Sequence, residues 1–118
     1  MFHVVRVFSD REGESHFEDV EIPLTDKGSV GYLSEGISAG QVIFREVDPG
    51  YDWDFHVAPQ RQFIVLLDGE IEIETSLGAR RTFKPGEILL MEDTTGKGHR
   101  TRNVRPVRRR SIFITLPD

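Results

Sequence analysis

Apolar residues occur along this chain in short runs of about five to eight residues, and glycine or proline separates one run from the next. The 11 glycines and 6 prolines are spread over most of the sequence rather than gathered in one linker. No segment keeps the i, i+3, i+4, i+7 spacing of an amphipathic helix, so we expect any helix to be very short. The pattern is typical of an all-β sandwich or barrel.

The apolar runs predict about eleven short strands joined by antiparallel turns. Asp68 and Gly69 form a hairpin signal, because both central residues of a type I′ turn take positive φ. The run 70–75 alternates cleanly, with its isoleucines on one face and its glutamates on the other. The predicted strands cover residues 2–8, 17–24, 30–33, 41–47, 52–58, 62–67, 70–75, 80–83, 87–91, 99–104 and 111–116.

Strict alternation also assigns faces in the two polar strands of the second half. In residues 52–58 the face of His56 also carries Asp54 and Ala58, whereas Trp53 is placed on the opposite face. For Trp53 we expect packing in the core rather than contact with a ligand. In residues 99–103 one face carries His99, Thr101 and Asn103, and the other carries Arg100 and Arg102.

Length and composition predict one globular domain without disulfides. The chain has 118 residues and no cysteine, and 37% of its residues are hydrophobic and 30% charged. No apolar run approaches the ~20 residues of a membrane span, and the first residues lack the order of a signal peptide. These features favour a cytoplasmic protein with no membrane partner. The net charge of −5 argues against broad nucleic-acid binding.

Six arginines lie between residues 100 and 110, against the acidic balance of the whole chain. Such a group could bind an anion, a nucleic-acid backbone or the acidic surface of a partner subunit. The favoured interpretation is that they are solvated side chains that pair with carboxylates elsewhere on the surface.

Two blocks of polar and glycine residues have regular spacing. Residues 50–69 read G-x5-H-x5-Q-x6-G, and residues 86–103 begin with glycine and end in H-x3-N. These blocks resemble the two motifs of the cupin superfamily. The resemblance implies that residues 1–118 form a single domain, a double-stranded β-helix or jelly-roll barrel. The residues that carry it are Gly50, His56, Gln62, Gly69, Gly86, His99 and Asn103.

The sequence departs from the family pattern at the positions of the metal ligands. Ala58 stands where the family has a second histidine, and Gln62 stands where it has a glutamate. The resemblance implies metal binding by His56, Gln62 and His99, and Asp54 is a further candidate for the missing carboxylate. Because one donor and the negative charge are lost, we expect zinc, nickel, iron or manganese to be held weakly or not at all.

The resemblance brings the candidate site residues together at the mouth of the barrel. An amide can both donate and accept hydrogen bonds, which favours recognition of a small molecule over redox chemistry. We therefore expect a small-molecule-binding protein. The alternative is an enzyme, either a metal-dependent oxygenase or a metal-independent isomerase or lyase, with His56 and His99 as the candidate catalytic residues. The predicted ligand-binding residues are His56, Gln62, His99, Thr101 and Asn103.

Two further expectations concern the loop 92–98 and the oligomeric state. Gly96 and Gly98 would let this loop bend closely over the mouth of the barrel, and Lys97 is either a solvated lysine or a cation for an anionic ligand. Cupins commonly dimerise through their sheet edges, so the resemblance implies a homodimer.

Overall fold

The computed structural model describes residues 1–117, which contain one 3-10 helix, Gly28–Val30, and otherwise only strands and loops. No helix within this range is long and apolar enough to cross a bilayer. The strands are β1 (Phe2–Ser9), β2 (Ser15–Ile22), β3 (Thr25–Asp26), β4 (Tyr32–Leu33), β5 (Val42–Val47), β6 (Asp52–His56), β7 (Gln62–Leu66), β8 (Ile71–Thr75), β9 (Arg80–Phe83), β10 (Ile88–Met91), β11 (His99–Asn103) and β12 (Arg109–Thr115).

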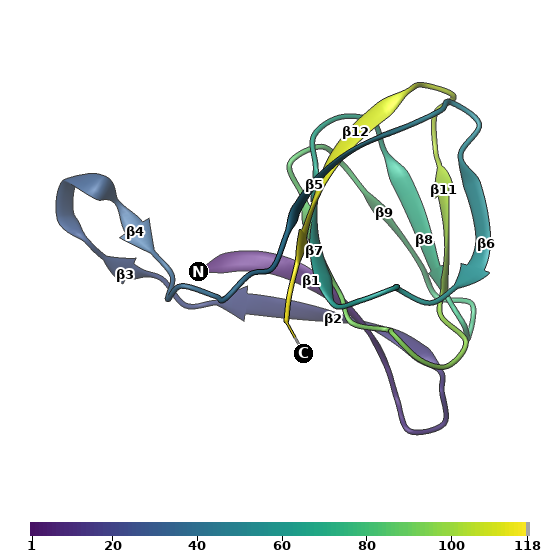
Figure 1. Cartoon of the computed structure of the whole chain (residues 1–118), viewed down its shortest axis with the longest axis horizontal. Coiled ribbons are helices and arrows are strands. Elements are labelled where there is room, and N and C mark those ends of the chain that lie inside the picture. The colour runs from purple at the N-terminus through teal and green to yellow at the C-terminus, as the bar shows by residue number, and fades with distance from the viewer. Residues whose placement is uncertain (118) are drawn as a thin grey trace.

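Two sheets face each other and enclose the core, as the all-β prediction requires. One has the order β2-β1-β10-β7-β12-β5 and the other has the order β6-β11-β8-β9. Figure 1 shows them curving into a barrel whose open end lies between β12, β5, β6 and β11. All pairings are antiparallel except that of β1 with β10. The predicted jelly-roll barrel is confirmed.

The core lies between the sheets because strand alternation points apolar side chains inward. In β8, Ile71 and Ile73 are buried while Glu72 and Glu74 between them are partly exposed, as the sequence predicts. Each isoleucine loses most of its contact with water, a gain of about 1.5–3 kcal/mol per side chain. The buried cluster comprises Val5, Val7, Ala58, Leu66, Ile71, Ile73, Phe83, Leu89 and Met91.

The turn between β7 and β8 differs from the predicted type I′ turn. Gly69 has a φ of 71°, but no residue other than glycine has positive φ within residues 1–117, so Asp68 does not. Asp68 instead accepts a hydrogen bond from the backbone N–H of Arg110 at 2.6 Å and pairs with its guanidinium at 2.8 Å. The glycine is therefore required, whereas Asp68 ties the turn to β12.

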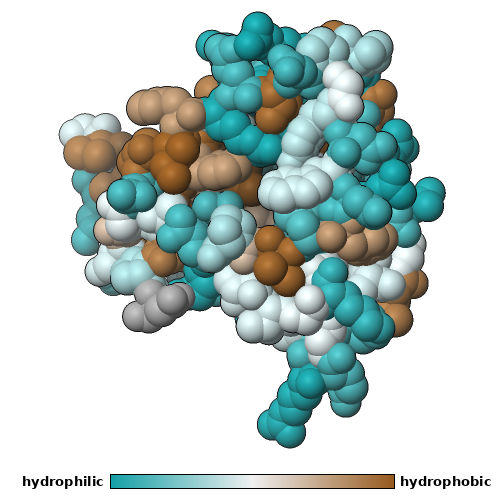
Figure 2. All heavy atoms as spheres, turned by 45° about the vertical axis from the view of Figure 1, so that its right-hand side comes forward, coloured by the Kyte–Doolittle hydropathy of each residue, from teal (hydrophilic) through white to brown (hydrophobic). Residues whose placement is uncertain are grey.

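A hairpin formed by β3 and β4 extends away from the barrel (Figure 1). The sequence predicts a strand near residues 30–33 but not its partner β3, which is only two residues long. The hairpin and the following loop leave Val30, Tyr32 and Ile37 exposed, at 73%, 68% and 55%. Figure 2 shows apolar side chains gathered on the side of the molecule that carries this hairpin.

Candidate functional site

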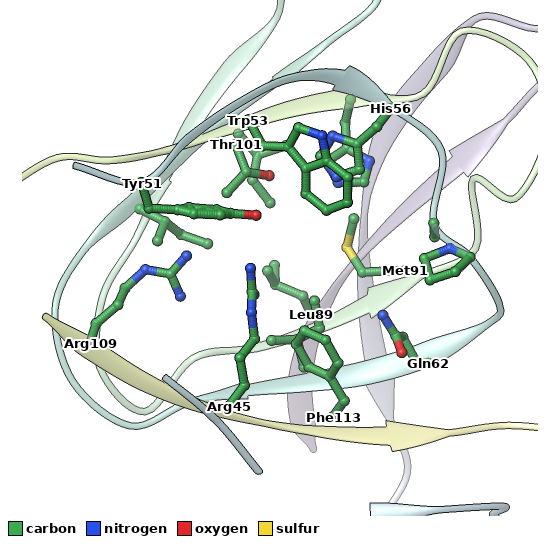
Figure 3. A pocket seen from close by; sticks show the side chains of 16 residues that line it. Arg45, Tyr51, Trp53, His56, Gln62, Leu89, Met91, Thr101, Arg109 and Phe113 are labelled. Carbon is green, nitrogen blue, oxygen red and sulfur yellow. The ribbon is translucent and has the colours of Figure 1, made fainter. Parts of the chain in front are cut away.

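A cavity of about 280 Å³ lies between the two sheets at the open end of the barrel (Figure 3). Its floor is apolar and is formed by inward-facing residues of β8 and β10. Polar side chains from β5, β6, β7, β11 and β12 surround this floor. The lining residues are Arg45, Tyr51, Trp53, His56, Ala58, Pro59, Gln62, Ile64, Ile71, Ile73, Leu89, Met91, His99, Thr101, Arg109 and Phe113.

A β-bulge in β6 brings Trp53 and His56 to the same side of the strand. His56 pairs with His99 and Trp53 pairs with Thr101, so three steps along β6 match two steps along β11. The Trp53 ring consequently stacks on the His56 imidazole, with centroids 3.6 Å apart and an interplanar angle of 9°. The prediction that Trp53 lies on the opposite face and packs in the core is wrong, because strict alternation does not anticipate a bulge.

The two histidines of the motifs meet in the cavity. Their ring centroids are 4.5 Å apart and their planes are tilted by 57°. The Nδ1–H of His56 donates to the carbonyl of Asp54 at 2.8 Å, and the Nδ1–H of His99 donates to the carboxylate of Asp93 at 2.5 Å. Both contacts use Nδ1. Each neutral ring therefore keeps the lone pair of Nε2 for a ligand or a proton.

Burial lowers the pKa of His56 below its ordinary value, because desolvation penalises the imidazolium. The hydrogen bond to the Asp54 carbonyl and the charge of Asp93 oppose this effect, while the positive charge of Arg45 adds to it. The neutral form of His56, with its accepting nitrogen, is therefore the dominant form near neutral pH.

Asp93 is a site residue that the motif pattern did not reveal. Its side chain is completely buried behind His99, and one of its oxygens, Oδ1, has no hydrogen-bond partner among residues 1–117. Its carbonyl accepts a hydrogen bond from the N–H of Ala58 at 3.1 Å, which fixes the loop 92–98 against the end of β6. A carboxylate behind an imidazole fixes both the orientation and the tautomer of the ring. The only sequence signal is an acidic residue in a loop just before a motif histidine.

The structure brings together four of the five predicted ligand-binding residues. His56, Gln62, His99 and Thr101 line the cavity, and Gln62, His99 and Thr101 are buried. Asn103 does not line it. The Asn103 amide nitrogen instead contacts the backbone carbonyls of residues 48, 49 and 107, and its oxygen accepts a hydrogen bond from Arg109 Nε at 2.7 Å.

Neither of the two additional charged candidates reaches the cavity. The side chain of Asp54 is exposed and accepts a hydrogen bond from the backbone N–H of Phe55, so it does not replace the missing carboxylate. Lys97 forms an ion pair with Glu14 on the surface. The glycines of this loop do allow close approach: Gly98 lies against the His56 carbonyl, and Gly96 lies against Gly13.

Five of the six arginines between residues 100 and 110 are surface residues paired with carboxylates, as the sequence predicts. Arg109 is the exception, since its side chain is buried, with 2% exposed, and lines the cavity. Alternation along β12 places Arg109 on the inward face with Ser111 and Phe113. The observed pairs are Arg100–Asp52, Arg102–Glu72, Arg105–Glu70, Arg108–Glu46 and Arg110–Asp68.

The donor groups of the cavity fit a divalent metal poorly. The two imidazoles provide nitrogen donors, but Ala58 has none and the Gln62 amide carries no charge. Within residues 1–117 no three histidine, aspartate, glutamate or cysteine side chains form a metal-binding cluster. The guanidinium groups of Arg45 and Arg109 line the same cavity and repel a cation.

Comparisons of the sequence find no matching family model and no match among curated proteins. Solved structures do match. A sugar phosphate isomerase of the cupin superfamily from Silicibacter pomeroyi is 17% identical, with a TM-score of 0.52 over 98% of this chain and 69% of that one. A protein from Neisseria meningitidis is 12% identical, with a TM-score of 0.46 over 70% and 84% of the two chains.

A third similar structure is a conserved protein of unknown function from Streptococcus pyogenes, 14% identical, with a TM-score of 0.44 over 84% of this chain and 98% of that one. At these identities only the fold is shared, and the Silicibacter structure carries that conclusion. The shared fold agrees with the barrel described above. The chain is a small protein of the cupin fold.

Proposed function

We propose that this protein binds a small molecule in the cavity between its two sheets. The observation that carries the proposal is the combination of an apolar floor with a few convergent polar groups, which is the usual composition of a ligand site. The Nε2 atoms of His56 and His99 and the amide of Gln62 can each bind a polar group of the ligand, while Leu89 and Met91 contact its carbon atoms.

Tryptophan fluorescence can detect binding in the cavity, because Trp53 is the only tryptophan of the chain and lines the site. A library of soluble metabolites is added to the purified protein, and the fluorescence of Trp53 and the melting temperature are recorded. We expect a saturable response that weakens in His99→Ala. The matched control is His3→Ala, because His3 lies on the surface and pairs with Asp19 at 2.8 Å. Equal responses in the two variants would contradict binding in the cavity.

The second candidate function is metal-independent acid–base catalysis by an isomerase or lyase. Two observations favour it: His56 and His99 face each other with free Nε2 atoms, and the buried carboxylate of Asp93 supports one of them. A neutral imidazole and a carboxylate-supported imidazole can exchange a proton with a carbon acid. An oxygenase is less well supported, because it needs the metal that the donor set does not fit.

The enzyme hypothesis is tested by solvent deuterium exchange. Sugar phosphates are sensible first substrates, since the Silicibacter relative is a sugar phosphate isomerase. Proton NMR would follow exchange beside the substrate carbonyl in the presence of wild-type protein and of His56→Gln. If exchange proceeds no faster with wild-type protein than without protein, across the substrates that bind, the protein is a binder and not an enzyme.

We also propose that the protein forms a homodimer. A groove on the outer face of the six-stranded sheet is lined by Phe2, Val4, Phe63 and Ile114 among other residues, and the neighbouring β3–β4 hairpin leaves its own apolar side chains exposed. A second copy of the chain would cover both apolar surfaces, because a two-fold interface places the hairpin of each copy in the groove of the other.

A further inference from the structure

Two arginines from neighbouring strands point into one end of the cavity. In the pairing of β5 with β12, Arg45 lies opposite Ser111. Ser111 follows Arg109 by two residues along β12, so Arg45 and Arg109 are diagonal neighbours on the same face. Diagonal neighbours of this kind lie about 7–8 Å apart, with their β-carbons somewhat closer, which is within reach of long side chains. Figure 3 shows both guanidinium groups and the hydroxyl of Tyr51 directed toward the same space.

The positive charge at this end has no carboxylate partner within residues 1–117. The ion pairs made by residues 100–110 all involve surface arginines, and among the described residues neither Arg45 nor Arg109 forms an ion pair. Arg109 Nη2 is buried and has no hydrogen-bond acceptor in the part of the chain that the structure describes. The Tyr51 ring lies beside both guanidinium groups, with its centroid 4.8 Å from Arg45 Cζ and 5.1 Å from Arg109 Cζ, but it carries no negative charge. A buried guanidinium without a counter-ion is costly, so an anion bound here would remove an existing penalty.

Arg109 is held in place independently of any ligand. Its Nε donates to Asn103 at 2.7 Å, and a β-carbon added at Gly69 would lie 2.9 Å from Arg109 Cβ. Asn103 in turn is fixed by three backbone carbonyls. Burial and the neighbouring charge of Arg45 lower the pKa of Arg109 to about 10, so it stays protonated at neutral pH. The charge is therefore preorganised.

We propose that Arg45 and Arg109 bind the oxyanion group, phosphate or carboxylate, of a small organic ligand, with Tyr51 as a further donor. This inference rests on the proposed function and names the class of its ligand. A phosphate monoester carries about −1.5 to −2 at neutral pH and matches two guanidinium charges better than a single carboxylate does. With the anion at this end, the rest of the ligand extends over Leu89 and Met91 toward the imidazoles.

The test uses matched pairs of compounds that differ mainly in the anionic group. Glycerol 3-phosphate is compared with glycerol, and lactate with propane-1,2-diol, by titration of Trp53 fluorescence. We expect saturable binding of the anionic members, weakened about tenfold or more in Arg45→Gln and Arg109→Gln, because each removes charged hydrogen bonds. Arg100→Gln is the control, since Arg100 lies on the surface beside Asp52. If Arg109→Gln does not fold, Arg45→Gln on the edge strand decides the result.

Each outcome decides between the hypotheses. Tighter binding of glycerol 3-phosphate than of lactate would identify a phosphate, and the reverse order would identify a carboxylate. If the neutral members bind as tightly as the anionic ones, and Arg45→Gln binds like wild type, the oxyanion inference is overturned while binding in the cavity stands. If no compound of either class gives a saturable response, in these titrations or in the metabolite library, both proposals are overturned.

Discussion

Replacement of Gly98 by alanine should damage both the stability and the site, because this glycine is where the loop 92–98 touches β6. Gly98 has a φ of 72°, and an added β-carbon would lie 2.0 Å from the carbonyl oxygen of His56 and 2.3 Å from its carbonyl carbon. Such contacts fall well below the 3.0 Å that real β-carbons keep from other atoms. The loop or the strand must therefore move by about 1 Å.

Two contributions determine how much stability Gly98→Ala loses. A left-handed conformation costs about 1–2 kcal/mol for a residue with a β-carbon, and overpacking against backbone typically adds about 1–3 kcal/mol. Gly98→Ala should therefore lower the free energy of unfolding by about 2–5 kcal/mol, a large part of the ~5–15 kcal/mol of an ordinary domain. Because the displaced group is His56, the Trp53–His56 stack should also change, and with it the tryptophan emission.

Gly86→Ala is the matched control. Gly86 also has positive φ, at 89°, but a β-carbon there would meet nothing within 4 Å. It should therefore cost only the conformational part, about 1–2 kcal/mol. Urea unfolding followed by circular dichroism gives both values. If the two variants agree within about 0.5 kcal/mol, and Trp53 emission is unchanged in Gly98→Ala, the close approach of the loop to β6 is refuted.

Three further predictions concern pH, metal and assembly. The folded protein holds the pKa of His56 below its ordinary value of about 6.5, so the unfolded chain takes up a proton at higher pH than the folded one does. The free energy of unfolding should therefore fall as the pH drops below about 6.5. Denaturation repeated across this pH range should show a smaller fall in His56→Gln. Elemental analysis of untagged protein should find far less than one zinc, nickel, iron or manganese per chain, and a stoichiometric metal lost in His99→Ala would contradict the charge argument. Light scattering should give the mass of a dimer that dissociates in Tyr32→Asp and persists in Leu77→Asp, since both residues are 68% exposed but only Tyr32 lies in the β3–β4 hairpin. A monomeric wild type would contradict the dimer.

Alternation predicted the strands, and the family resemblance carried by the motif spacing predicted the jelly-roll barrel and the meeting of the two histidines. The apolar runs follow the inward faces of the strands, and turn residues separate them, so strand positions could be read locally. His99 pairs directly with His56, because the histidine of each motif lies in one of two neighbouring strands of the smaller sheet, β11 and β6. The resemblance, and not the periodicity, predicted this pairing, since no local signal fixes contacts between distant strands.

The remaining site residues depend on tertiary contacts that leave little trace in the sequence. A single extra residue in β6 reverses the face of Trp53, and nothing near it marks a bulge. Asn103 has the position of a ligand but is used to hold a loop and Arg109. Arg109 was grouped with its surface neighbours by composition, although alternation with Ser111 and Phe113 would have placed it inward.

The departures from the cupin pattern that the sequence resembles and the two cavity arginines both disfavour a cation in the cavity. Loss of the carboxylate at Gln62 and of the donor at Ala58 removes what would hold a cation, while Arg45 and Arg109 add positive charge that repels one and attracts an anion. The same charge reaches the imidazoles, because Arg45 is one of the groups that lower the pKa of His56. An anion that neutralises Arg45 would therefore raise the pKa of His56 and favour its protonation beside the bound ligand. If an oxyanion binds Arg45 and Arg109 as proposed, its charge would be coupled in this way to the proton affinity of His56.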